Sequence, residues 1–255
     1  MASLKPRAST RISIQWQGQP AAEETETLVL TFPGSYLDLR IYREGQPSAG
    51  AIQWAQAGSV EEIEKESDLP SLTFVPTISS VPALPPDVEV LPDQGTFKTM
   101  PNGDVEEYGT MFNPDTGRNQ EYIEVWRRLS LRSPLSVAGH STGDAASLLL
   151  ERTPSLPWPK VQSFLGHIGQ HGLGISRIQD TADSDPRFLA WREVFDFERA
   201  AWERIYTVGS REEVNLYLPS LNDVPKPDVL PGKDVLPGKG ETISLQNEDW
   251  MVKFR

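Results

Sequence analysis

The stretch TLVLTFPGSYLDLRIY, residues 27–42, indicates the fold of this chain. Residues 27–32 are rich in β-branched and apolar side chains, and residues 36–42 alternate apolar and polar side chains as a strand does. Pro33 and Gly34 between the two runs are a turn signal. The stretch therefore predicts a β-hairpin.

Similar short segments occupy most of the chain on both sides of this hairpin. The further predicted strands are residues 11–16, 51–57, 103–112, 121–131, 146–152, 166–177, 188–197, 201–209 and 250–254. Residues 60–67 are acidic and compatible with a helix, and residues 133–143 resemble a linker. Many short strands separated by turns are typical of sandwiches and barrels. The pattern predicts an all-β chain with two barrel-like halves.

Prolines gather between residues 70 and 101, where the sequence has seven of them. Proline has no amide hydrogen to donate to a neighbouring strand, so it is excluded from central strands. We therefore predict a long crossing loop over 70–101, with an extended piece around 71–77. Such a loop is either a lid over a barrel mouth or a passive connector.

Composition excludes several classes of function. The 255 residues include 36 acidic and 24 basic side chains, giving a formal charge of −12. This charge argues against a nucleic-acid partner and against binding to an anionic membrane surface. There is no cysteine, and therefore no disulfide or thiolate site. The N-terminus lacks the apolar run of a signal peptide. The absence of cysteine and of Asn-x-Ser/Thr sequons fits a cytoplasmic location, which is therefore expected.

Several motifs resemble the fungal Hri protein family. They are WAQAG at residues 54–58, GDVEEYG at 103–109, and the pattern Asn113-Pro114-x-Thr116-Gly117-x4-Tyr122-x-Glu124-x-Trp126. The resemblance implies a calycin-like fold with two lipocalin-like β-barrel halves in tandem, at residues 1–132 and 144–255. It implies no defined activity. Lipocalin-like barrels in fungi include cofactor-free cyclases of secondary metabolism, which is an analogy of fold alone.

The strands on either side of the 113–117 turn carry the most interesting polar residues. On the first strand Glu106 and Tyr108 share a face, and on the second Tyr122, Trp126 and Arg128 share one. If these faces line a barrel, a partly desolvated glutamate there has a raised pKa and can donate a proton. We predict Glu106, Tyr108 and Arg128 as catalytic residues. The alternative is that Ile123, Val125 and Leu129 form the core face and leave these polar groups in solvent.

Aromatic residues supply the predicted walls of a binding pocket. Tryptophan buries a large area and is seldom exposed without a reason. From their strand positions we predict that substrate binds against Trp54, Tyr122, Trp126, Trp202 and Tyr206.

Two further motifs suggest weaker alternatives. Residues 139–143 match G-x-S-x-G, the nucleophile turn of α/β-hydrolases, with Ser141 as nucleophile. The alternating βα pattern of that fold is absent, so a linker is the simpler interpretation. His140, His167 and His171 could bind zinc, but the glycines around them favour a plain hairpin. The duplicated hexapeptide DVLPGK at residues 228–239 is interpreted as a surface loop.

The leading hypothesis is a barrel that binds a hydrophobic small molecule and acts as a cofactor-independent cyclase of the hetero-Diels–Alder type. Such a catalyst positions reactants and polarises them with a hydrogen bond, so it needs no metal or cofactor. The alternative is a non-catalytic adaptor or carrier of the Hri type that meets a protein partner or forms a homodimer. A serine hydrolase at Ser141 is the third hypothesis.

Overall fold

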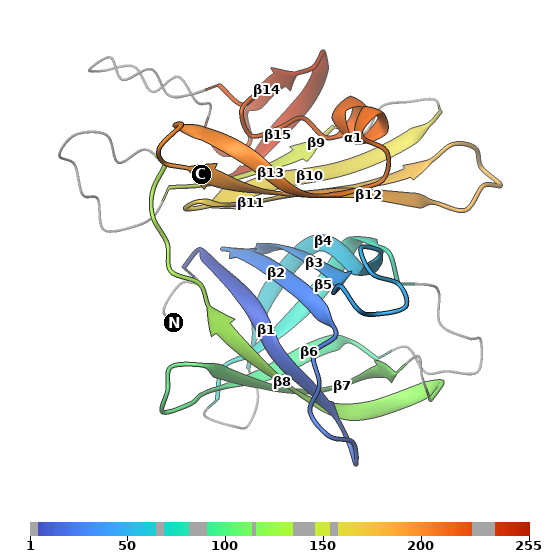
Figure 1. Cartoon of the computed structure of the whole chain (residues 1–255), viewed down its shortest axis with the longest axis vertical. Helices are drawn as coiled ribbons and strands as arrows, with labels where there is room; N and C mark the ends of the chain where they lie inside the picture. The colour runs from blue at the N-terminus through green and yellow to red at the C-terminus, as the bar shows by residue number, and fades with distance from the viewer. Residues whose placement is uncertain are drawn as a thin grey trace. The chain divides into compact units, whose positions relative to one another are not determined.

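The computed structural model describes residues 5–64, 69–81, 91–113, 116–134, 146–153, 158–225 and 238–255. The chain divides into two compact units, Met1–Leu129 and Ser130–Arg255 (Figure 1). Strands make up nearly all of the regular structure in both units, so the all-β prediction is confirmed. The limits 1–132 and 144–255 stay predictions for domains that fold independently.

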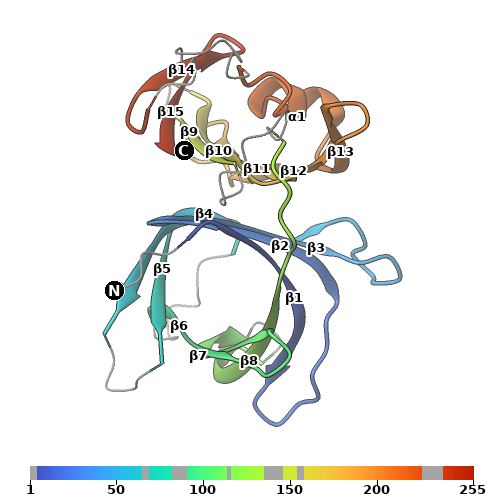
Figure 2. The same ribbon diagram turned by 90° about the vertical axis from the view of Figure 1, so that its left-hand side faces the viewer.

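The first unit is a closed antiparallel barrel (Figure 2). Each strand pairs with the next along the chain, and β1 pairs with β8 to close the ring. The strands are β1 (Arg7–Trp16), β2 (Thr25–Phe32), β3 (Ser35–Tyr42), β4 (Ile52–Ile63), β5 (Ser71–Ser79), β6 (Asp93–Thr99), β7 (Val105–Asn113) and β8 (Arg118–Arg128).

Two predictions in this unit are wrong. The helix-compatible segment 60–67 begins as strand, because β4 continues to Ile63. The predicted loop 70–101 contains two strands: β5 includes the extended piece predicted around 71–77, whereas β6 was not predicted. Pro76 is tolerated within β5 because it lies beside a register shift opposite Gly58, where the ladder is already irregular. A side chain at Gly58 would clash with the backbone of Val75 and Pro76, so glycine permits this close approach.

The hairpin that opened the sequence analysis is confirmed, and its polar face is the one that points into the barrel. Thr31 pairs with Tyr36, and Thr27 pairs with Arg40. Tyr36, Asp38 and Arg40 of β3 line the interior cavity, whereas the leucines that alternate with them face the other way. The barrel therefore has a polar interior along β3.

The second unit is a seven-stranded antiparallel sheet with one short helix. Its strand order is β13-β12-β11-β10-β9-β15-β14, and no pairing among the described residues joins the edge strands β13 and β14. The strands are β9 (Ser147–Arg152), β10 (Lys160–Ile168), β11 (His171–Gln179), β12 (Arg187–Asp196), β13 (Ala201–Val208), β14 (Thr242–Leu245) and β15 (Glu248–Phe254). The second half is therefore β as predicted, and its described residues form a sheet rather than the closed ring of the first unit.

An apolar cluster and the helix fill one face of this sheet. Helix α1 (Arg211–Tyr217) starts at Ser210, whose side chain accepts a hydrogen bond from the Glu213 amide and so caps the helix. Val214 of the helix belongs to a cluster that also contains Trp191 and Trp250, both fully buried. Across the described residues, no helix is long and apolar enough to cross a membrane.

Candidate binding site in the barrel

The interior of the barrel contains a cavity of about 370 Å³. Every strand of the barrel contributes to its lining. The lining combines aromatic, aliphatic and charged side chains, among them Arg7, Ser9, Val29, Thr31, Tyr36, Asp38, Arg40, Trp54, Gln56, Leu72, Phe74, Asp93, Phe97, Glu107, Tyr122, Glu124, Trp126 and Arg128. This size and mixture are typical of sites for small organic ligands.

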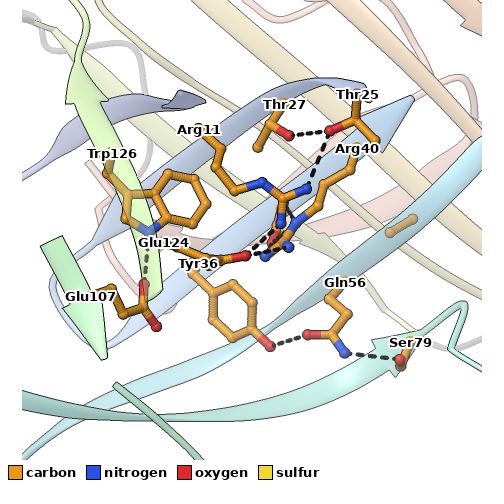
Figure 3. A network of polar contacts seen from close by, with 12 residues as sticks. Arg11, Thr25, Thr27, Tyr36, Arg40, Gln56, Ser79, Glu107, Glu124 and Trp126 are labelled. Atoms are coloured by element: carbon orange, nitrogen blue, oxygen red, sulfur yellow. Dashed lines mark hydrogen bonds and ion pairs between the residues drawn. The ribbon is translucent and has the colours of Figure 1, made fainter. Parts of the chain in front are cut away.

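A buried ionic network lies beside the cavity (Figure 3). Glu124 accepts hydrogen bonds from two guanidinium groups, those of Arg11 and Arg40, the latter at 3.0 Å. Arg40 also donates to Asp38 at 2.8 Å, and Arg11 to Glu23 at 2.6 Å. Burial alone would lower the pKa of Arg40, but Asp38 and Glu124 more than compensate and raise it. The network is therefore a rigid, charge-paired part of the interior.

Glu107 of β7 is a buried acid of the cavity lining with a strongly raised pKa. Tyr122 donates a hydrogen bond to its Oε1 at 3.0 Å. The Trp126 indole donates to its Oε2 at 2.8 Å, as Figure 3 shows. Burial, together with the negative charges of Glu124 and Asp93, raises the pKa of Glu107 to about 8. At neutral pH this carboxyl group is mostly protonated, so it can donate a proton or a hydrogen bond into the cavity.

Two glycines make room for Glu107 and its partner. Gly95 of β6 pairs directly with Gly109 of β7. A Cβ at Gly95 would meet the Glu107 carboxyl group, and one at Gly109 would meet the Tyr122 ring. The absence of a side chain at both positions lets the glutamate and the tyrosine lie flat against the wall.

Aromatic rings form the rest of the cavity wall. The Tyr36 ring packs edge-on against Phe74, with 5.2 Å between centroids, and its hydroxyl donates to Gln56 at 3.1 Å. The Arg40 guanidinium lies 4.9 Å from the Trp54 ring centroid and 5.7 Å from that of Trp126. These cation–π contacts hold the two indoles around the charged network. The buried Trp54 Nε1 has no hydrogen-bond partner among the described residues.

Four of the predicted site residues line the cavity. They are Trp54, Tyr122, Trp126 and Arg128, which come from β4 and β8. Strands β4 and β8 are not neighbours in the barrel, so these four residues line the same cavity only because the barrel closes.

The prediction that Glu106 and Tyr108 share this lumen is wrong. In the β7–β8 hairpin Asn113 pairs with Arg118, so odd residues of β7 lie opposite even residues of β8. Glu107 therefore faces Glu124, and Glu106 lies opposite Val125. The Tyr108 hydroxyl donates to Glu106 outside the cavity lining. A shift of one residue moves every side chain to the other face of a strand.

The prediction of Trp202 and Tyr206 in the same site is also wrong, because both lie on β13 of the second unit. Trp202 packs against the apolar cluster of that unit, with its ring 5.1 Å from His167. Tyr206 lies 5.6 Å from the Arg192 guanidinium. Aromatic residues do line the cavity as predicted, but the sequence pattern did not show which aromatic residues belong to the first unit.

The remaining motifs give no site in the described residues. Ser141 and His140 lie outside them, as does most of the DVLPGK repeat. His167 and His171 lie in the β10–β11 hairpin and bond to the backbone carbonyls of Gly169 and Ser130. Burial lowers the pKa of His167 to about 4. Within the described ranges, no three His, Asp or Glu side chains are grouped to hold a metal ion.

The fold and cavity define a β-barrel protein with a polar, partly charged lumen. The family model described as Protein HRI1 matches residues 7–253, so the chain belongs to this family. Among solved structures, an uncharacterized protein of Saccharomyces cerevisiae, YLR301w, is similar with a TM-score of 0.68 and 19% identity over 97% of both chains. At this identity the likeness concerns the fold alone. None of the curated proteins compared with the chain matches it.

Proposed function

We propose that the first unit binds a small organic molecule inside its barrel. The observation that carries this proposal is the cavity of about 370 Å³ with convergent polar groups on an aromatic wall. A barrel built only for stability would gain by filling this space, because empty volume in a core costs stability. Here large side chains such as Trp126 and Phe97 surround the space without filling it.

The lining indicates what kind of molecule fits. Leu72, Phe74 and Phe97 belong to one apolar cluster and offer a surface for a hydrophobic or aromatic body. Glu107 and the indole N–H of Trp54, which has no partner among the described residues, offer hydrogen bonds to polar atoms of the same molecule. The ligand is therefore a hydrophobic body that carries a few polar groups.

A cavity-filling variant tests this proposal. Val29→Trp places an indole in the lumen, whereas Thr110→Trp places one on the exposed face of β7. The neutral probe 2-(1-naphthyl)ethanol is titrated into the full-length chain by calorimetry. We expect binding to the wild type and to Thr110→Trp, and loss of binding in Val29→Trp with an unchanged circular dichroism spectrum. Equal binding by both variants would place the probe outside the barrel and overturn the proposal.

Catalysis of a cyclisation is the second candidate, and Glu107 is the observation that favours it. A protonated carboxyl group beside two aromatic residues can polarise a heterodiene by a hydrogen bond while the walls hold both reactants together. The test adds the protein to an ortho-quinone methide and an alkene, with the enantiomeric excess as the readout. A non-racemic product that Glu107→Gln makes racemic supports the candidate, and a racemic product with the wild type refutes it. Adaptor function, a protein partner and the cytoplasmic location stay predictions.

A further inference from the structure

Arg7 and Arg128 lie together at one end of the barrel cavity. Arg7 is the first residue of β1 and Arg128 the last of β8. Arg128 pairs with Ser9, two residues along the same face of β1 from Arg7, and all three line the cavity. Diagonal neighbours on adjacent strands lie within reach of long side chains. The two guanidinium groups therefore share one region of space.

Among the described residues, Arg7 and Arg128 lack the carboxylate partners that the other two arginines inside the barrel have. Arg11 and Arg40 each bond to carboxylates inside the barrel. The side chains of Arg7 and Arg128 make no hydrogen bond or ion pair within the part of the chain that the structure describes. Burial is the largest cause that lowers the pKa of Arg7, and the positive charge of Arg128 lowers it further, as a nearby like charge does.

The acid that raises the pKa of Arg7 does not compensate the charge of this arginine at neutral pH. Glu107 lines the same cavity and acts on Arg7, but its carboxyl group is mostly protonated at pH 7. Two hydroxyl donors complete this end of the cavity, because Ser9 lies opposite Arg128 and Thr31 lies opposite Arg7. Two guanidinium groups with hydroxyls beside them form a donor set for an oxyanion.

We infer that the barrel takes an amphipathic organic anion, whose carboxylate or phosphate group is held by Arg7 and Arg128 while its apolar body lies along Leu72 and Phe97. This inference rests on the proposed function and specifies its ligand class. Arg128 is exposed, so the acid group stays near solvent and only the apolar part is fully desolvated. The whole chain has a charge of −12, which repels anions. The two arginines therefore give the cavity a local selectivity for anions in spite of the overall charge.

Three probes with the same aromatic body test the inference on the full-length chain. They are 1-naphthaleneacetate, 2-(1-naphthyl)ethanol and 2-(1-naphthyl)ethylamine, compared by calorimetry, with 1-naphthyl phosphate as a fourth arm. We expect the acetate to bind at least about 10-fold more tightly than the alcohol, since a hydrogen bond to a charged group is worth that much. The phosphate arm decides between the two acid groups. Binding of the alcohol equal to that of both anions would overturn this inference and leave the proposed function standing.

Variants assign the selectivity to the two arginines. In the Arg7→Gln/Arg128→Gln double variant the anion should lose about 10-fold in affinity or more, while the affinity of the alcohol is unchanged. Arg127→Gln is the matched control, because Arg127 neighbours Arg128 but bonds to Asp104 and does not line the cavity. Added salt should lower the affinity of the wild type for the anion but not for the alcohol. This measurement does not depend on whether a variant folds. Failure of all probes to bind would overturn the proposed function as well.

Discussion

The two units of this chain enclose opposite kinds of interior. The barrel surrounds a cavity whose lining includes Arg40, Glu107 and Glu124. In the second unit, one face of the sheet is covered by an apolar cluster that contains two fully buried tryptophans, Trp191 and Trp250. Both units consist of antiparallel strands with alternating side chains, so the secondary structure does not distinguish them. The difference shows that the chemistry of an interior depends on which face of each strand the topology turns inward.

The first prediction concerns the filled interior. Trp250→Ala should lower the free energy of unfolding of the second unit by about 3–5 kcal/mol, because it removes a large side chain from a packed cluster. Trp54→Ala in the barrel should cost less, since Trp54 already borders open space. Hydrogen exchange followed by mass spectrometry reports each unit separately. Equal losses would contradict the contrast between a filled and an open interior.

The second prediction concerns the charged interior. Glu124→Gln leaves Arg11 and Arg40 without their shared carboxylate and should destabilise the barrel by about 2–3 kcal/mol. Urea denaturation followed by tryptophan fluorescence measures this change. Glu121→Gln on the same strand is the control, because Glu121 is exposed and its substitution should change stability by no more than about 0.5 kcal/mol. A cost no greater than that of the control would mean that the network adds nothing to stability.

The third prediction uses the pKa of Glu107. The group is protonated in the folded barrel up to about pH 8 but ionises near its ordinary value of 4.5 when unfolded. Between these values the folded state binds the extra proton, so stability falls as pH rises, by up to about 1.4 kcal/mol per pH unit. Glu107→Gln should remove this slope, whereas Glu106→Gln should keep it. The measurement is the unfolding free energy of the barrel from pH 5 to 8.

Other charged groups face Glu107, and the experiment must separate their effect on the pH dependence of stability from that of Glu107. Glu124 and Asp93 raise its pKa, and Arg40 lowers it. Burial also raises the pKa of Asp93 to about 6, which adds a slope of the same sign below that pH. The comparison is therefore the difference between wild type and Glu107→Gln above pH 6. An identical slope in both proteins would show that Glu107 is ionised in the folded barrel.

The fourth prediction is a pH dependence of stability in the second unit with the opposite sign. His167 stays neutral in the folded state down to about pH 4, because burial opposes its charge, and it protonates near 6.5 when unfolded. Stability of this unit should therefore fall as pH decreases from 6.5 to 4, with the same upper slope of about 1.4 kcal/mol per unit over a narrower interval. His167→Gln should weaken this dependence without abolishing it, because burial also lowers the pKa of His171. Loss of stability at low pH that His167→Gln leaves unchanged would refute the assignment.

The strand pattern predicted more of the fold than of the site. The hairpin at residues 27–42 and most other strands follow from local alternation and turn residues, which act over a few positions. The prolines between 70 and 101 misled the prediction, because β5 accommodates Pro76 at an irregularity that depends on Gly58 of a different strand. No local pattern contains that pairing.

The site shows the same division. Sequence identified the aromatic residues Trp54, Tyr122 and Trp126 as pocket walls, because large aromatic side chains in strands are buried. The sequence prediction named Glu106 instead of Glu107, because alternation alone does not show which face of the strand points into the barrel. The pairing of Asn113 with Arg118 in the hairpin decides between them. The length of that turn was the one signal in the sequence that could have given the correct face.

The amino-acid sequence by itself determined that this chain is all-β, because the alternation of side chains and the turn residues are local properties. Tertiary structure alone decided that the polar face of β3 points inward, that Arg11 and Arg40 share Glu124, and that Glu107 is buried beside it. These features arise when β1 closes on β8 and brings distant strands around one space. Barrel closure is a long-range event, and the raised pKa of Glu107 and the proposed anion site both depend on it.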